Sequence, residues 1–160
     1  MNAERAASTE NGDLERVLAA GVEWVGREYA RRVRDSLRKI GGKAEEGREP
    51  ASGVLQGEWV TDIVFVGENL PDETYFDVII AAIDEADGDA DVLWCIADGP
   101  VDHLVGRDLV MGERLRSRRD DPHVDLMFTT MQLYLRGIGH LDGSWWADDF
   151  VAKPRRRPDR

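Results

Sequence analysis

Basic residues are missing from the whole middle of this 160-residue chain, since no Lys or Arg occurs between Glu49 and Arg107. The segment 51–104 instead holds thirteen Asp and Glu residues, which give it a formal charge of −13 against −11 for the whole chain. Charge segregation of this kind sets the sign of a surface and therefore concerns partners more than fold. This charge pattern does not indicate any particular reaction.

Cysteine and long hydrophobic runs are also scarce. The single Cys95 cannot form an internal disulfide, and it lies in an apolar run where a free cysteine behaves as a small buried hydrophobe. The longest apolar runs, 78–83 and 92–97, have six residues each, whereas a membrane helix needs about 20. The N-terminal residues carry acids and lack the apolar stretch of a secretory signal. We therefore expect a cytoplasmic protein without a membrane segment.

Periodicity and composition predict an all-α protein with a single compact domain. Hydrophobic residues recur at steps of three and four from Leu14 to Ile40, and again in several shorter segments. About six to seven helices, packed as antiparallel helical hairpins, account for this pattern. The predicted divisions are a disordered N-terminus (1–12), a helical domain (13–150) and a basic disordered tail (151–160). Within the domain we expect a long first helix (13–40), a loop (41–53), a helical core (54–135) and a C-terminal Trp segment (136–150).

The helical core contains one ambiguous segment and one clear helix start. Residues 60–66 are rich enough in β-branched side chains to form a strand, but the spacing of Trp59, Ile63 and Val66 favours a helix. Pro71 followed by two acids predicts the start of the next helix, because proline suits a first turn and acids complement the positive end of the helix dipole. That helix is expected to end at Asp87-Gly88-Asp89.

Two further Pro-containing pairs predict helix boundaries. Gly99-Pro100 is expected to close one helix and open another, because glycine suits the left-handed position after a helix and proline suits the first helical position. Asp121-Pro122 predicts the start of the last helix by the same reasoning.

Residues 92–128 resemble a bacterial domain family of unknown function. The core of that family runs as an apolar helix, Gly-Pro-Leu-Glu-Asp-Leu, a helix, Asp-Pro and a final helix. Here the segment 99–104 (Gly-Pro-Val-Asp-His-Leu) occupies the first motif and Asp121-Pro122 the second. The resemblance covers roughly residues 55–135 and departs from the pattern at Asp102-His103, where the family more often has Glu-Asp. It implies an all-helical fold and no established activity.

The sequence gives little support for a catalytic or metal-binding site. His103, His123 and His140 form no His-x-x-x-His pair and lie near no cysteine, so neither a metal nor a cofactor is expected. Asp102 and His103 could form an acid/base pair, but adjacent residues on a helix point about 100° apart. We instead expect Asp98 and Asp102 to satisfy backbone donors at a helix start. This makes the helix-turn motif structural rather than catalytic; its residues are Asp98, Gly99, Pro100, Asp102 and His103.

The acidic middle points to a protein partner with a basic surface. Some of its acids should pair with arginines of the first helix and of the segment 114–119, which leaves the remainder free for a partner. The candidate partner-binding residues are Glu58, Asp62, Asp77, Asp84, Glu85, Trp145 and Trp146. Neither nucleic acid nor membrane is expected, because an acidic surface repels phosphate. The sequence leaves the oligomeric state open.

Trp145 and Trp146 allow two interpretations. They can be exposed anchors for a partner, since tryptophan is enriched in interface hot spots. Alternatively, they fasten the C-terminal segment over the helical core.

Three functions remain as hypotheses. The leading one is a non-enzymatic protein–protein interaction domain. The alternative is an immunity-type or antitoxin-like protein that neutralises a basic toxin, because opposite charges speed encounter and add specificity. The third is an enzyme with its site near Asp98–His103.

Overall fold

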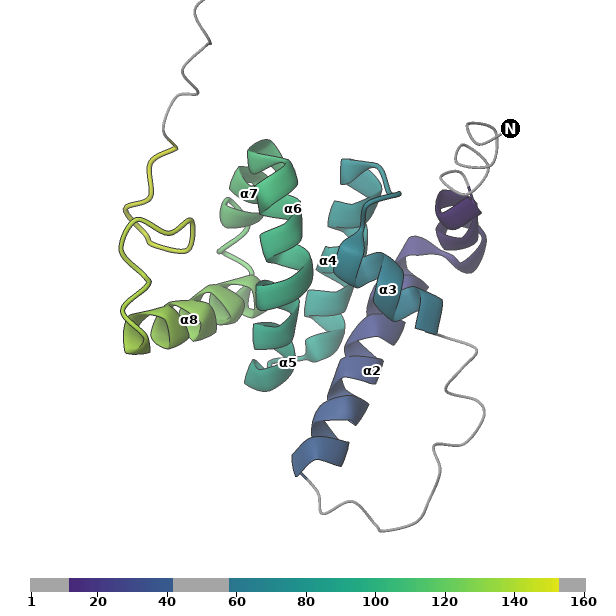
Figure 1. Ribbon diagram of the computed structural model, residues 1–160, viewed down its shortest axis with the longest axis horizontal. Helices are drawn as coiled ribbons and strands as arrows, with labels where there is room; N and C mark the ends of the chain where they lie inside the picture. Colours follow the sequence, from purple (N-terminus) through teal and green to yellow (C-terminus); the bar gives the residue numbers. More distant parts are fainter. Residues whose placement is uncertain (1–11, 42–57, 153–160) are drawn as a thin grey trace, which may run out of the picture.

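The computed structural model describes residues 12–41 and 58–152, which form helices and turns without any strand (Figure 1). A short helical segment over residues 12–20 precedes the labelled helices. These are α2 (Val22–Gly41), α3 (Glu58–Val66), α4 (Asp72–Ala86), α5 (Ala90–Ile96), the π-helical turn η2 (Ala97–Val101), α6 (Asp102–Arg107), α7 (Leu109–Arg116) and α8 (Pro122–Gly137). The predicted all-α class is confirmed. The predictions for residues 1–11, 42–57 and 153–160 lie outside the described residues.

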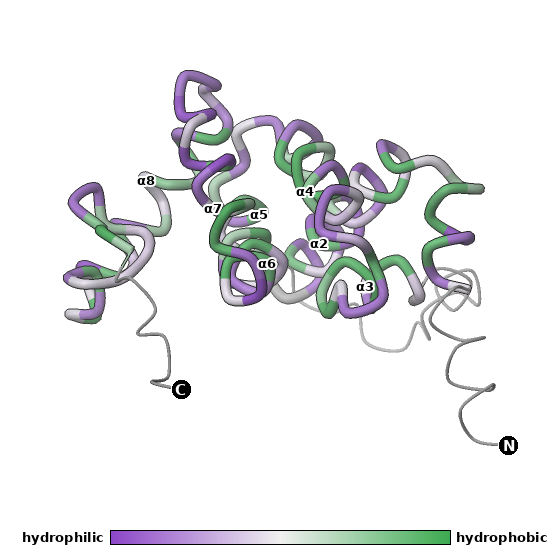
Figure 2. The backbone as a smooth tube through the Cα atoms, turned by 90° about the horizontal axis from the view of Figure 1, so that it is seen from above, coloured by the Kyte–Doolittle hydropathy of each residue, from purple (hydrophilic) through white to green (hydrophobic). Residues whose placement is uncertain are grey.

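Helix α4 lies at the centre of the hydrophobic core. Phe76, Ile79 and Ile83 are fully buried, and Tyr75 and Val78 are buried beside them. Figure 2 shows hydrophobic stretches in α4 and α5, and in other helices as well. Burial of this apolar surface is the main force that holds the helices together.

Helices α2 and α4 run in the same direction. Glu23 near the start of α2 shares a pocket with Asp77 of α4, whereas Arg34, further along α2, donates to the carbonyl oxygens of Glu85 and Ala86. By contrast, α4 is antiparallel to the continuous α5–α6 helix: Arg107 at the end of α6 lies 2.7 Å from Asp72 at the start of α4. The hairpin arrangement therefore applies to α4 and α5–α6, while α3 crosses in front of α2 and α4 (Figure 1).

The predicted single helix over residues 13–40 is wrong at one point. Its hydrophobic periodicity continues across residue 21, but Gly21 has φ +95°, which ends one helix before α2 begins at Val22. Only glycine adopts this backbone conformation without steric cost. The break separates the segment 12–20 from α2.

The predicted helix boundary at Gly99-Pro100 is also wrong, because α5, η2 and α6 form one continuous helix. Pro100 has no N–H and its ring crowds the preceding turn of a regular α-helix. The wider π-helical turn accommodates it: the N–H of Asp102 donates to the carbonyl oxygen of Ala97, five residues back. The backbone donors that Asp98 and Asp102 were expected to satisfy are therefore used within the helix.

Other predicted elements are confirmed. Residues 58–66 form a helix rather than a strand, and α4 begins one residue after Pro71 and ends at the predicted Asp87-Gly88-Asp89 turn. The side chain of Asp121 accepts from the N–H of His123 at 2.8 Å, which caps α8 directly before Pro122. Within the described ranges, no helix has both the length and the apolar character required to span a membrane.

Candidate interaction surface

The predicted acidic residues do not form one surface. Asp62 lies exposed on α3, whereas Asp77 and Asp84 lie exposed on α4 beside α2. Glu85 is not free for a partner, since its carboxylate accepts from Arg31 Nε at 2.9 Å. The side chain of Glu58 lies outside the described part of the chain. The acidic block thus divides into a region on α3 and a region between α2 and α4.

The region between α2 and α4 is a shallow pocket of about 360 Å³. Val22, Ile80 and Ala81 supply apolar lining, and the remaining lining residues are charged: Glu23, Arg27, Asp77 and Asp84. Arg27 lies 3.4 Å from Glu23, so one cation already offsets part of the negative charge.

The region on α3 combines acids with exposed apolar side chains. Phe65 is 58% exposed and Val66 is 39% exposed, which is unusual beside a core in which Val60 and Val64 are fully buried. Asp62 lies one turn before Phe65 on the same helix, and Glu68 follows the end of α3. Phe65 also lies over Gly99, where an added Cβ would be 3.2 Å from the ring, and the exposed Asp98 precedes Gly99 in the chain. We call this set (Asp62, Phe65, Val66, Glu68 and Asp98) the α3 face.

The acids of the α3 face are unpaired within the described structure. Asp62, Glu68 and Asp98 form no salt bridge with any residue of 12–41 or 58–152. This distinguishes them from Asp72, Glu73 and Glu85, which pair with Arg107, Arg114 and Arg31. The α3 face therefore presents negative charge that no described cation offsets.

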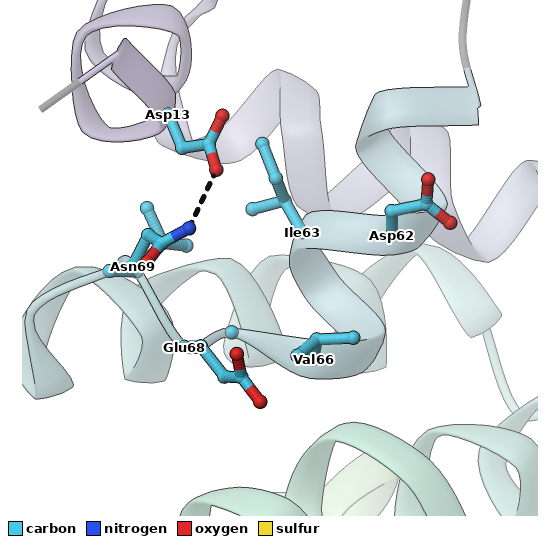
Figure 3. A pocket seen from close by; sticks show the side chains of 8 residues that line it. Asp13, Asp62, Ile63, Val66, Glu68 and Asn69 are labelled. Carbon is cyan, nitrogen blue, oxygen red and sulfur yellow. Dashed lines mark hydrogen bonds between the residues drawn. The ribbon is translucent and has the colours of Figure 1, made fainter. Parts of the chain in front are cut away.

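A small pocket opens at the edge of the α3 face (Figure 3). Its volume is about 180 Å³, and Ile63 and Val66 line it together with the carboxylates of Asp13, Asp62 and Glu68. Asn69 donates from Nδ2 to Asp13 at 3.0 Å, so one carboxylate is held in place while Asp62 and Glu68 have no such partner in Figure 3.

Arg107 positions the end of α3. Its guanidinium donates to the carbonyl oxygens of Gly67 at 2.6 Å and Leu70 at 3.2 Å, and it pairs with Asp72 at 2.7 Å. Arg107 is the first basic residue after the acidic block, and this position in the sequence is a signal for its structural role. Phe65 has no comparable signal in the sequence, because it is neither one of the periodic apolar residues of this helix (Trp59, Ile63 and Val66) nor an acid.

The helix-turn motif does not assemble a catalytic pair. The Asp102 carboxylate accepts from Trp146 Nε1 at 3.0 Å, whereas His103 lies edge-on to Tyr75 with ring centroids 5.8 Å apart. Desolvation of the carboxylate raises the pKa of Asp102 above its usual value, and the hydrogen bond from Trp146 opposes that shift. The residue as a whole still retains substantial exposed surface. Desolvation and the nearby Arg107 lower the pKa of His103. The two side chains thus serve different neighbours.

Trp145 and Trp146 are not exposed anchors. Their side chains are 8% and 3% exposed and pack on Phe128 of α8, with ring centroids 5.3 and 5.1 Å away. The prediction that they bind a partner directly is therefore wrong, and the alternative, in which they fasten the C-terminal segment over the core, is confirmed.

Metal-binding geometry is absent from the described residues, where no three His, Cys, Asp or Glu side chains are grouped to hold an ion. Comparisons with protein families, with curated proteins and with solved structures found no significant match. The resemblance to a bacterial helical family therefore stays a prediction.

Proposed function

We propose that this protein is a protein-binding domain and that its α3 face docks a partner with a basic surface. The observation that carries the proposal is an exposed aromatic side chain, Phe65, on an element that also carries acids without a described salt bridge. Aromatic residues are enriched at protein interfaces, where they supply most of the apolar contact. Exposure of such a residue costs hydrophobic free energy unless a partner covers it.

The charge of the α3 face defines the chemistry of the partner. Asp62, Glu68 and Asp98 would meet Lys or Arg side chains, while Phe65 and Val66 would meet an apolar patch between them. Opposite charges around an apolar contact raise the association rate and exclude acidic competitors. A −11 net charge extends this attraction beyond the contact itself.

A narrower form of the proposal is an immunity-type or antitoxin-like protein. The same unpaired acids favour it, because toxins that act on nucleic acid carry cationic surfaces that an acidic protein can cover. Under this hypothesis a neighbouring gene encodes a basic toxin, and the two proteins bind each other with an affinity that falls steeply as salt is raised.

An enzyme with a site near Asp98–His103 receives less support. Asp102 is engaged by Trp146, and His103 lines neither of the two pockets described above. If the motif is structural, His103→Ala should leave a cellular phenotype of the gene unchanged; loss of the phenotype at an unchanged melting temperature would favour catalysis.

The α3 face can be tested by site-specific crosslinking. A photo-crosslinking phenylalanine analogue is placed at position 65 in one variant and at position 133 in a matched control, because Phe65 and Leu133 are 58% and 61% exposed. Both proteins are irradiated in an extract of the native host. We expect one dominant protein adduct from position 65 and none of that product from position 133. The same products from both positions, or none from position 65, would contradict the proposal.

A further inference from the structure

The chain folds back over its own helices after α8. Residues 144–150, which we call the C-terminal strap, contain no helix, and they lie beside α8 in Figure 1. The strap nevertheless buries Trp145, Trp146 and Ala147 almost completely. An irregular segment that is buried to this degree requires specific partners for its backbone.

Side chains of α7 and α8 supply those partners. Arg116 donates to the carbonyl oxygens of Trp145 and Ala147, the second at 3.1 Å, and Gln132 donates to the carbonyl oxygen of Trp146 between them at 2.8 Å. Two side chains thus bind three consecutive carbonyls of the strap. Among the described residues, the backbone–backbone hydrogen bonds of the strap stay within 141–150, so the helices hold it through side chains.

Each tryptophan occupies its own position in the groove. Trp145 packs on Gly112 of α7, where an added Cβ would be 3.3 Å from the indole, and the Arg116 guanidinium lies 5.0 Å from its ring. Trp146 packs on Phe128 and donates from Nε1 to Asp102 of α6 at 3.0 Å. The bare backbone at Gly112 thus receives the Trp145 ring by packing alone, whereas Asp102 also accepts a hydrogen bond from the Trp146 indole.

An acid completes the contact. Asp148 accepts from Arg119 Nη1 at 2.6 Å and from Gln132 Nε2 at 2.9 Å. These two donors hold the pKa of Asp148 below its usual value. Recognition therefore extends over four consecutive residues, Trp145-Trp146-Ala147-Asp148.

We propose that the groove formed by α6, α7 and α8 is a peptide-binding site, and that the C-terminal strap is its ligand in cis. The ligand class is an extended peptide with two adjacent tryptophans, a small residue and an acid. Every described hydrogen bond between the strap and residues 102–132 ends on a side chain of α6, α7, α8 or the turn between α7 and α8, so none depends on the covalent link to α8. The connecting residues 137–143 include Gly137, Gly139 and Gly143, two of them with positive φ, and this composition suits a hinge.

Cutting the chain between α8 and the strap tests whether the strap is an exchangeable ligand or a part of the core that the fold requires. A protease recognition sequence is inserted between Asp142 and Gly143 of the full chain, the purified protein is cut, and the released strap is removed by gel filtration. A fluorescent synthetic peptide of residues 143–152 is then added and its anisotropy measured. We expect the cut protein to keep its helical circular dichroism and to bind the peptide, and the Trp146→Ala peptide to bind at least about tenfold more weakly. Loss of the helical signal after cutting, or no peptide binding, would overturn the proposal.

A second measurement does not depend on cutting. In the uncut protein the strap competes with added peptide, so wild type should bind the peptide weakly. The uncut Trp146→Ala variant, with its fold checked by circular dichroism, should bind the wild-type peptide at least about tenfold more tightly than the uncut wild type does. Equal binding by the two uncut proteins would show that the groove does not exchange its ligand.

Discussion

At the scale of single residues, Gly26 determines how closely α2 approaches α4. A Cβ at this position would lie 2.7 Å from Ala81 Cβ and 2.9 Å from the backbone nitrogen of Ala82. Real Cβ atoms do not approach this closely, and the backbone of α4 cannot yield as a flexible side chain can. The pairing of α2 with α4, on which the core depends, therefore requires glycine here.

Gly26→Ala should lower the free energy of unfolding by about 1–3 kcal/mol, the usual cost of overpacking a core. Urea denaturation followed by circular dichroism measures the change at a constant slope. Gly106→Ala is the matched control, because no heavy atom lies within 4 Å of its added Cβ. Alanine favours a helix over glycine, so the control should gain up to about 1 kcal/mol. Equal effects of the two substitutions would contradict close α2–α4 packing.

Residue types predicted the candidate site only in part. Asp62 could be selected because it is an acid on the outer side of a periodic helix. Phe65 could not, because its exposure depends on where α5–α6 and the segment after α3 lie, and these are tertiary contacts. The sequence leaves both interpretations of Trp145 and Trp146 open for a similar reason: nothing in their local sequence reveals that Gly112 and Phe128 form a surface for them.

At the scale of elements, the connection between α3 and α4 depends on Arg107. Its bonds to the carbonyl oxygens of Gly67 and Leu70 satisfy backbone groups that no helix satisfies, and its guanidinium lies 5.3 Å from the Tyr75 ring. One side chain from α6 thus fixes both ends of the connection.

Arg107→Ala should destabilise the protein by about 1–3 kcal/mol, since it removes the side-chain donor to the Leu70 carbonyl oxygen and leaves that of Gly67 with only the Leu70 N–H. Arg27→Ala removes an exposed i,i+4 pair with Glu23 and should cost at most about 0.5 kcal/mol. Thermal unfolding of both variants against wild type measures the difference. If the two melting temperatures fall equally, Arg107 does not tie the connection together.

The break before α2 can be tested by the sign of the stability change that a substitution at Gly21 causes. At φ +95°, Gly21→Ala introduces left-handed strain and should cost about 1–2 kcal/mol. If the helix ran unbroken through residue 21, as periodicity predicts, the same substitution would gain up to about 1 kcal/mol. Chemical denaturation of the variant distinguishes the two, and a stabilised Gly21→Ala protein would contradict the break.

The elements divide clearly into those that sequence could predict and those that it could not. Helices α4 and α8 begin at their predicted Pro and Asp signals, because capping and the helix dipole act within a few residues. The Gly21 break and the π-helical turn at Pro100 run against the local pattern. In both places the packing of the flanking helices determines the backbone, and no window of sequence contains that information.

At the scale of the whole molecule, the described arginines pair with four acids of the acidic block: Asp72, Glu73, Glu85 and Asp89. As predicted, Arg31 of α2 and Arg114 of α7 pair with Glu85 and Glu73, and Arg107 pairs with Asp72. These pairs lie at the two ends of α4. Asp62, Glu68 and Asp98 form no described salt bridge, and neither do Asp77 and Asp84 beside α2. Of these two acidic regions, only the α3 face also carries an exposed aromatic side chain.

The affinity of the partner captured at position 65, measured across a salt series, tests this account most directly. Wild type is compared with the variant Asp62→Asn/Glu68→Gln/Asp98→Asn, whose substitutions keep side-chain size while removing charge. Rim charges are worth about 0.2–1 kcal/mol each, so the variant should bind about tenfold more weakly at low salt. Raising the salt from about 50 to 300 mM should weaken wild type more than the variant, because screening removes only the charged part of the attraction. Equal affinities with equal salt dependence would contradict the account.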